Sequence, residues 1–333
     1  MRIALDLFGG DNAPDTTLHG AKLACESSHA QGIDNLRVTL VGDCSKLSTA
    51  QTANLGDQID LYDVPGEYYN NDSAPHAAGK AEHSPIRIAL KLHREGKFDA
   101  VVSAGSTGAQ VIASLKELGT CTSINRPAIG VLLPTRKGFS LLLDVGASLV
   151  ASPKQLVQFT AMGYLYLTEI MGISSPRIGL LNVGKESGVG PQSVISANII
   201  LKQSKFDYIG FIEGGDILTD KADVIVTNGL VGNILLKYAE GFPRFLSNIL
   251  PDDMAGIAKS YISEKLDYQK FGGVPLLGIN GVSVIGHGSS SAQALSSAIL
   301  KAANMAKADF HSKLESFIVK KLSYYIPASL TEI

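Results

Sequence analysis

The chain has 333 residues, of which 45% are hydrophobic and 18% are charged, and its formal net charge is −2. This length suffices for one large α/β domain or for two lobes with buried cores. The charge balance gives no support for a nucleic acid partner, which would require a basic face.

Cysteine usage and hydropathy indicate a cytoplasmic location. The three cysteines, Cys25, Cys44 and Cys121, lack the spacing of a metal site or a disulfide framework. The N-terminal apolar stretch is too short for a signal peptide and is interrupted by Asp6. No stretch reaches the roughly 18 apolar residues that span a bilayer. We therefore expect a cytoplasmic protein, with peripheral membrane contact left open.

Short apolar runs alternate with helical patterns along the chain. We expect strands at 2–7, 36–41, 59–64, 100–103, 128–133, 140–145, 177–182, 208–212, 222–226 and 282–285, and helices at 15–28, 84–92, 111–118, 155–171 and 289–325. The polar segment 66–83 is expected to be a loop or a flap. Buried strands that alternate with helices predict an α/β fold with a mostly parallel sheet covered on both faces.

The segment 98–110, FDAVVSAGSTGAQ, has the pattern of a strand, a glycine turn and a helix start, with Thr107 able to cap the helix. Glycines let the backbone approach a ligand closely, and the unpaired N–H groups of a helix start attract an anion. Any strand-to-helix turn of an α/β protein can have this pattern. The segment is evidence for a binding site only because the same pattern recurs along the chain.

Seven predicted strands end in glycine together with polar side chains. Ligands of such sheets bind beyond the carboxyl ends of the strands, so we expect one site assembled across the sheet. Its candidate binding residues are Asp6, Gly9, Gly10, Asp11, Ser103, Gly105, Ser106, Thr107, Gly108, Asp144, Gly146, Asn182, Gly184, Glu186, Glu213, Asp216, Asn228, Gly229, Gly232, Gly288, Ser289 and Ser290. The dinucleotide and P-loop fingerprints are missing, which disfavours a nucleotide ligand and makes a dehydrogenase the weakest reading.

The segment 234–271 predicts a helical hairpin whose two helices, 234–250 and 254–271, are joined at 251–253. Its first helix carries Phe242, Phe245, Leu246, Ile249 and Leu250. Such a hairpin packs into a core or a subunit interface, or it projects toward a membrane or an apolar substrate. We expect residues 1–333 to form one catalytic unit, with a two-lobed form left open, from which this hairpin projects.

Ten motifs, in order along the chain, carry a resemblance to a known family. They are DLFGGDNAP, VVSAGSTGA, INRPAIGVLLPT, LLLDVGA, LVQFTAMG, LLNVGKE, IEGGDI, ADVIVTNGLVGN, GGVPLLGINGV and IGHGSS. With these motifs the chain resembles the PlsX family, the phosphate acyltransferases of bacterial phospholipid synthesis, over nearly its whole length.

The resemblance implies transfer of a long-chain acyl group from acyl carrier protein to inorganic phosphate. The acyl phosphate product would then serve a glycerol 3-phosphate acyltransferase. It also implies a three-layer α/β/α sandwich of the isocitrate dehydrogenase and phosphotransacetylase type, a homodimer, no metal or organic cofactor, and peripheral membrane association in some members.

The resemblance places Asn233 at a position that the family uses in catalysis. The family also has a lysine where this chain has Val189, so the nearest lysine, Lys185, is the candidate cation, although it can equally be a solvated surface residue. Arg126 is a second candidate cation near phosphate, ranked above Lys137 because it precedes a proline and a strand. His287 either protonates the leaving sulfur or orients its loop. Ser106 replaces the usual asparagine, and His83-Ser-Pro replaces Ser-Ser-Met.

Acidic carrier proteins are expected to dock on basic side chains, which increase the rate of encounter. The candidates on predicted helices are Arg87, Lys91, Arg94, Lys259, Lys265 and Lys270. Two other functions stay open. One is a phosphotransacetylase that uses coenzyme A and a short acyl group, and the other is a non-catalytic scaffold at the membrane.

Overall fold

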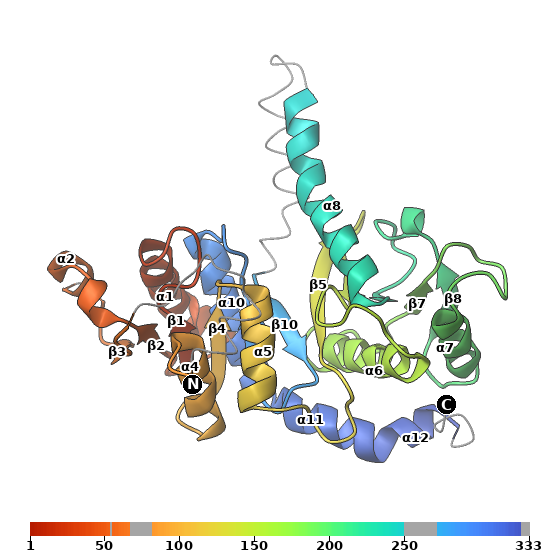
Figure 1. The fold of residues 1–333 in the computed structure, drawn as a ribbon, viewed down its shortest axis with the longest axis horizontal. Coiled ribbons are helices and arrows are strands. Elements are labelled where there is room, and N and C mark those ends of the chain that lie inside the picture. Colours follow the sequence, from red (N-terminus) through yellow and green to blue (C-terminus); the bar gives the residue numbers. More distant parts are fainter. Residues whose placement is uncertain (54, 67–81, 250–271, 328–333) are drawn as a thin grey trace. The chain divides into compact units, whose positions relative to one another are not determined.

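The computed structural model describes residues 1–53, 55–66, 82–249 and 272–327. The chain divides into two compact units, each described here by itself (Figure 1). Unit 1 contains Met1–Cys121 and Gln269–Ser312, and unit 2 contains Thr122–Tyr268 and Lys313–Ile333.

Unit 1 is built on a sheet with the strand order β3-β2-β1-β4-β11-β10. All neighbours are parallel except β10, which runs antiparallel to β11. The register pairs Leu5 with Val102 and Ser103 with Ile285, so β1, β4 and β11 end at the same edge. The strands are β1 (Arg2–Asp6), β2 (Arg37–Gly42), β3 (Ile59–Asp63), β4 (Ala100–Ser103), β10 (Val274–Leu277) and β11 (Ser283–Ile285).

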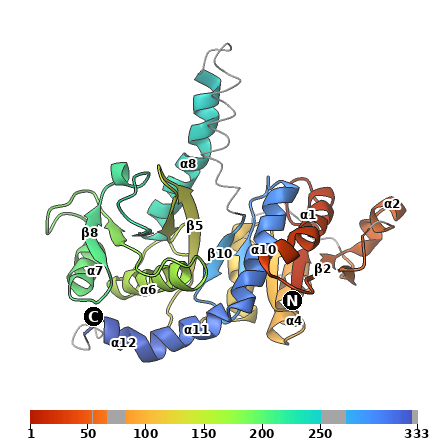
Figure 2. The same cartoon turned by 180° about the vertical axis from the view of Figure 1, so that it is seen from behind.

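Two pairs of helices cover the sheet of unit 1. The helices α4 (Pro85–Arg94) and α5 (Thr107–Glu117) pack together on one face, and α1 (Asp15–Ser27) and α10 (Ala292–Lys307) pack together on the other (Figures 1 and 2). The sequence explains α4, since Pro85 occupies the first turn and apolar residues at helical spacing face the sheet. The short helices of unit 1 are η1 (His29–Gln31), η2 (Cys44–Lys46) and α2 (Thr49–Thr52).

Unit 2 is built on strands in the order β5-β6-β9-β7-β8. The strand β5 runs antiparallel to β6, and the other neighbours are parallel. The strands are β5 (Ala128–Pro134), β6 (Phe139–Leu143), β7 (Ile178–Leu181), β8 (Tyr208–Ile212) and β9 (Val224–Val226). The helices are α6 (Pro153–Glu169), α7 (Gln192–Lys202), η3 (Gly214–Asp216) and α8 (Gly229–Ile249). The chain returns from unit 1 within α11 (Phe310–Ser316), and unit 2 then contains a π-helical segment (Phe317–Lys321) and α12 (Leu322–Tyr325).

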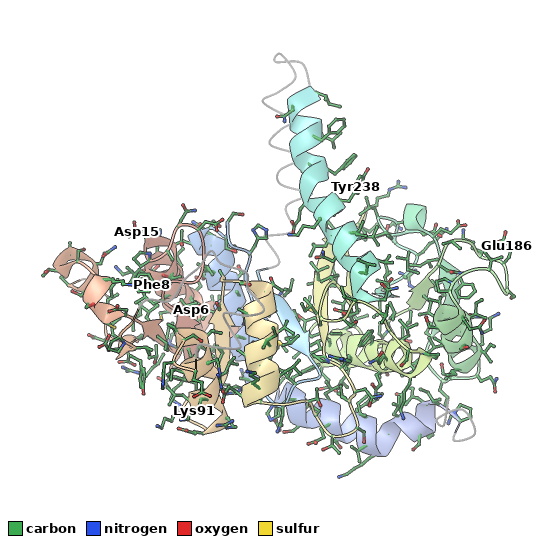
Figure 3. All side chains as sticks on the ribbon, in the orientation of Figure 1. Asp6, Phe8, Asp15, Lys91, Glu186 and Tyr238 are labelled. Atoms are coloured by element: carbon green, nitrogen blue, oxygen red, sulfur yellow. The ribbon has the colours of Figure 1, made fainter. Side chains whose placement is uncertain are left out.

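The helix α8 carries an apolar stripe along one side. Exposed apolar residues follow one another at helical spacing, so they share a face. Tyr238 is 67% exposed, and its side chain points away from the helix (Figure 3). The stripe consists of Leu230, Ile234, Tyr238, Phe245 and Ile249. The second predicted helix of the hairpin, with Lys259, Lys265 and Lys270, lies outside the described residues, as does most of the predicted flap 66–83.

The predicted strands are all present, with ends that differ by one or two residues. Four details differ. The strand β10 and the helix α7 were not predicted, and α8 begins at Gly229 instead of at residue 234. Ser106, and not Thr107, caps α5, because its side chain accepts a hydrogen bond from the backbone N–H of Ala109. No helix in the described ranges combines the length and the apolar character needed to cross a membrane.

Candidate functional site

Three strand-end turns of unit 1 are joined by backbone hydrogen bonds. The N–H of Gly286, after β11, donates to the carbonyl oxygen of Ser103, at the end of β4, over 2.7 Å. The N–H of Asp11, after β1, donates to the carbonyl oxygen of Gly288 over 2.8 Å. Gly10 has φ +120°, a conformation that favours glycine. Residues far apart in the sequence therefore meet at one edge, as the strand-end pattern predicted for this half of the chain.

A buried serine and a carboxylate lie at the centre of this edge. The Oγ of Ser103 donates to Oδ2 of Asp6 over 2.7 Å and accepts from the N–H of Gly105 over 3.0 Å. Burial raises the pKa of Asp6, while the hydrogen bonds from Ser103 and from the N–H of Phe8 oppose that rise. Asp6 is the last residue of β1, and Phe8 lies near it in the turn that follows (Figure 3).

The first turn of α5 presents hydrogen-bond donors beside these turns. Ser106, Thr107 and Gly108 are exposed. Within the described part of the chain, the N–H groups of Thr107 and Gly108 have no acceptor. Such groups, at the positive end of the helix dipole, favour an anion.

His287 is tied into its own turn. Its Nδ1 accepts a hydrogen bond from the N–H of Ser289 at 3.2 Å and lies 2.8 Å from the hydroxyl of Ser289, while the Oγ of Ser290 accepts from the N–H of His287. An accepting Nδ1 assigns the proton of the neutral ring to Nε2. These contacts hold the ring within its own turn, so the geometry favours the loop-orienting role.

In unit 2 a carboxylate occupies the turn after β6. Oδ1 of Asp144 accepts from the N–H groups of Ile129, Gly146 and Ala147 at 3.0 to 3.1 Å. Its Oδ2 accepts from both the N–H and the hydroxyl of Ser148 at 2.8 Å. Asp144 is fully buried, so these five donors satisfy a charge removed from water. Nothing in the sequence identifies Ile129 and Ser148 as partners of Asp144, because backbone N–H groups and a lone serine give no signal of such contacts.

The start of α8 packs directly against this turn. A Cβ at Gly229 would lie 1.9 Å from the carbonyl oxygen of Ser148, and one at Gly232 would lie 1.8 Å from that of Asp144. Both positions therefore require glycine. Asn233 follows on the same side of the helix and borders Gly146, whose φ is +140°.

Two asparagines at the start of α8, Asn228 and Asn233, differ in their hydrogen bonds. The Oδ1 of Asn228 accepts from the N–H of Val231 over 3.0 Å, so Asn228 stabilises the helix start. Asn233 is exposed, and its amide makes no hydrogen bond to any described residue. The amide of Asn233 is thus available to a ligand.

Arg126 lies at the same edge of unit 2. It precedes β5, which runs antiparallel to β6, so the start of β5 is adjacent to the end of β6. Arg126 is exposed and forms no ion pair with the described residues. Of the two predicted cations, Arg126 is therefore the one available to an anion.

Lys185 is engaged with carboxylates. Its Nζ lies 3.3 Å from Asp216 and 3.5 Å from Glu213, and these partners, Asp216 first, raise its pKa. Asp216 also pairs with Lys221, which lowers the pKa of Asp216. Within the described ranges, no group of three or more His, Cys, Asp or Glu side chains could hold a metal ion.

The turn after β7 is held by Asn182. Its Nδ2 donates to the carbonyl oxygens of Gly184 and Val189 at 3.0 and 2.7 Å. Glu186 and Val189 are exposed on the same loop, which Figure 3 shows at Glu186. Asn182 therefore shapes this loop from within.

Two of the predicted docking cations are engaged inside unit 1. Arg87 donates to Glu117 from Nε over 3.0 Å, and Arg94 lies 3.1 Å from the same carboxylate. Glu117 is buried, so this cluster joins α4 to α5 and leaves Arg87 little exposed. Lys91 is exposed on α4 (Figure 3).

Known structures share this fold. A phosphotransacetylase from Streptococcus pyogenes matches with a TM-score of 0.60 at 15% identity, covering 92% of this chain and 94% of its own. A branched-chain phosphotransacylase from Enterococcus faecalis matches with a TM-score of 0.58 at 13% identity, covering 91% and 98%. These matches confirm the predicted α/β sandwich with a mostly parallel sheet.

Sequence relatives are closer. The family model described as fatty acid synthesis protein matches residues 1–313. A phosphate acyltransferase of Heliobacterium modesticaldum is 39% identical, covering 97% of this chain and 99% of the relative. One of Pelotomaculum thermopropionicum is 38% identical, covering 96% and 97%. The resemblance found in the sequence is confirmed: the chain belongs to the PlsX family of phosphate acyltransferases and is an acyltransferase.

Proposed function

We propose that this chain transfers a long-chain acyl group from acyl carrier protein to inorganic phosphate. The observation that carries the proposal is the edge of unit 1, where three turns meet beside the open N–H groups of Thr107 and Gly108. Membership of the phosphate acyltransferase family supports the same reaction.

Phosphate is the nucleophile in the proposed reaction. One of its oxygens forms a bond to the thioester carbon, the carbonyl oxygen gains negative charge, and the C–S bond then breaks to release the thiolate. Thiolate is a good leaving group, so no covalent enzyme intermediate is required. We assign phosphate binding to the turns after β1, β4 and β11, whose donors hold the anion in position.

Asn233 is the proposed donor to the carbonyl oxygen. Its amide is exposed beside Gly146, and the packing of Gly229 and Gly232 fixes the helix that carries it. A positioned donor of this kind stabilises the charge that develops on the oxygen during attack. Arg126, which precedes β5 in unit 2, is the proposed cation in place of the family lysine. Lys185 keeps a secondary role because its carboxylate partners already compensate its charge.

A trapping assay tests this function. Purified protein, phosphate and palmitoyl acyl carrier protein should give acyl phosphate, which hydroxylamine converts to a hydroxamate. No hydroxamate with donors of several chain lengths would refute the proposal.

Two alternatives are separated in the same assay. The likeness to phosphotransacetylases favours a short-chain reaction, which predicts faster turnover of acetyl coenzyme A than of palmitoyl carrier protein. The ion pair of Lys185 with Asp216 and the apolar stripe of α8 favour a non-catalytic scaffold at the membrane. This alternative predicts that the protein binds liposomes and turns over none of the acyl donors.

The proposed partners follow from this chemistry. An acidic carrier protein would meet exposed cations such as Lys91. Acyl phosphate is a reactive anhydride, so a glycerol 3-phosphate acyltransferase would consume it. The apolar stripe of α8 would contact either the second subunit of a homodimer or the surface of a membrane, with the protein otherwise in the cytoplasm.

A further inference from the structure

The carboxylate of Asp6 lies inside the edge that we assign to phosphate. Ser103 is 2% exposed and donates to Oδ2 of Asp6 over 2.7 Å, while the N–H of Gly105 donates to the same hydroxyl. These contacts fix the orientation of the carboxylate. Asp6 itself remains partly exposed.

Two glycines bring the backbone into close contact with this pair. A Cβ at Gly9 would lie 2.8 Å from the Oγ of Ser103 and 2.9 Å from Oδ2 of Asp6. A Cβ at Gly105 would lie 3.2 and 3.6 Å from the same two atoms. The turns after β1 and β4 therefore both lack a side chain where they face the carboxylate.

No cation neutralises Asp6 within the described residues. Its partners are the hydroxyl of Ser103 and the N–H of Phe8, and the ionisable side chains on the adjoining turns are Asp11 and His287. An ionised carboxylate only accepts hydrogen bonds, so it repels an anion that has no proton to donate. Inorganic phosphate keeps an O–H group at neutral pH, whereas sulfate of the same shape keeps none.

We propose that Asp6 determines the specificity of this edge for phosphate over sulfate, by accepting a hydrogen bond from the O–H of phosphate, and that Ser103 positions it. The other oxygens of the anion face the N–H groups of Thr107 and Gly108. No bond is made or broken in this recognition, and the proton stays with phosphate. The inference rests on the proposed function, because it assigns the substrate phosphate to this edge.

The test measures the dissociation constants of phosphate and sulfate by calorimetry with the intact protein at neutral pH. The wild type should bind phosphate more tightly than sulfate. In Asp6→Asn the amide oxygen still accepts from Ser103, but the amide N–H donates to either anion. The ratio of the two constants should therefore fall about 10- to 100-fold, the effect of a hydrogen bond to a charged group.

Ser103→Ala provides a second variant should Asp6→Asn fail to fold. It should move the same ratio in the same direction but less, and the double variant should add nothing to Asp6→Asn. A purely structural role would lower the melting temperature and leave the ratio unchanged. Asp15→Asn is the matched control, because Asp15 is exposed at the start of α1 and its carboxylate accepts a hydrogen bond from the side chain of Gln51 (Figure 3).

Two outcomes would overturn the inference. One is equal affinity of the wild type for the two anions, and the other is an unchanged ratio in a folded Asp6→Asn or Ser103→Ala variant. Failure of the wild type to form acyl phosphate would instead remove the proposed function, and the calorimetric ratio would still report on Asp6.

Discussion

The strand-end turns of the two units look alike in the sequence but differ in structure. In unit 1 the turns are joined through Ser103 and backbone groups, and the first N–H groups of α5 stay open. In unit 2 the N–H groups of Gly146, Ala147 and Ser148 already bind the carboxylate of Asp144. A glycine-rich turn can therefore serve a ligand, or it can enclose a side chain of its own. This contrast is why our proposal assigns phosphate to the turns of unit 1 and not to the Asp144 turn of unit 2.

Substitution of the proposed oxyanion donor should have the largest effect. Asn233→Ala should lower kcat about 10²- to 10³-fold, as loss of one such donor does in other acyl transfers. The melting temperature should not change, because the amide makes no hydrogen bond to any described residue. Asn248→Ala, exposed on the same helix, is the control and should keep full activity. Equal rates for the two variants would remove Asn233 from the mechanism.

Loss of the enclosed carboxylate should destabilise unit 2 strongly. Asp144→Ala leaves five donors without their acceptor and should lower the free energy of unfolding by about 3 kcal/mol. Ser103→Ala in unit 1 should lower it by only about 1 kcal/mol, since a single hydroxyl is lost. Chemical denaturation of both variants measures the difference. Similar losses would show that the two edges are held together in the same way.

Two glycines of α8 provide a matched pair. Gly232→Ala would place a methyl group against the carbonyl oxygen of Asp144 and should cost roughly 2 kcal/mol of stability. Gly241→Ala meets no described atom within 4 Å and should stabilise the helix by about 0.5 to 1 kcal/mol. The two melting temperatures should therefore move in opposite directions. A shift of the same sign in both would contradict the close packing of α8 on the Asp144 turn.

The opposite edge of the unit 1 sheet should show a weak sensitivity to acid. Nδ1 of His93 lies 2.8 Å from the carbonyl oxygen of Phe98, and its Nε2 accepts from the N–H of Val282 at 2.9 Å. Burial first, and then the charge of His311, lower its pKa, while Phe98 and Asp99 oppose the shift. The unfolded chain therefore binds this proton more readily than the folded one.

It follows that the stabilising contribution of neutral His93 is complete above its unfolded pKa of about 6.5 and decreases as the pH falls below it. The slope can reach about 1.4 kcal/mol per pH unit for one proton. Denaturation midpoints between neutral and mildly acidic pH measure it. His93→Gln should flatten the profile, whereas His29→Gln, on the surface, should not. An unchanged slope in His93→Gln would assign the acid sensitivity to other groups.

Much of the fold follows from local pattern. Apolar runs set the strands, and Pro85 set the start of α4, because these signals act over a few residues. The strand β10 has only four residues, one of them a proline, so it is too short to show the apolar pattern of a strand. The segment GLVGN was predicted as a strand-end turn, yet it is the first turn of α8. Its glycines are required by contact with Asp144 and Ser148, which no local pattern reveals.

The sequence predicts which candidate residues lie at the same edge of the sheet, but it does not predict which side chains they contact. The carboxyl ends of parallel strands share an edge, so the grouping of Asp6, Ser103 and Gly288 could be expected. Whether a candidate side chain is free to bind a ligand depends on its hydrogen-bond and ion-pair partners, and these partners are remote in sequence. Lys185 meets Asp216, and Arg87 meets Glu117, at separations of about 30 residues, so their engagement could not be inferred from spacing.

The most direct test of the proposed reaction follows the thiol of the carrier protein. If phosphate attacks the thioester directly, thiol release from palmitoyl carrier protein should require phosphate and should equal the acyl phosphate formed, mole for mole. Thiol released at the same rate without phosphate, or an acyl group found covalently attached to the protein by mass spectrometry, would contradict it.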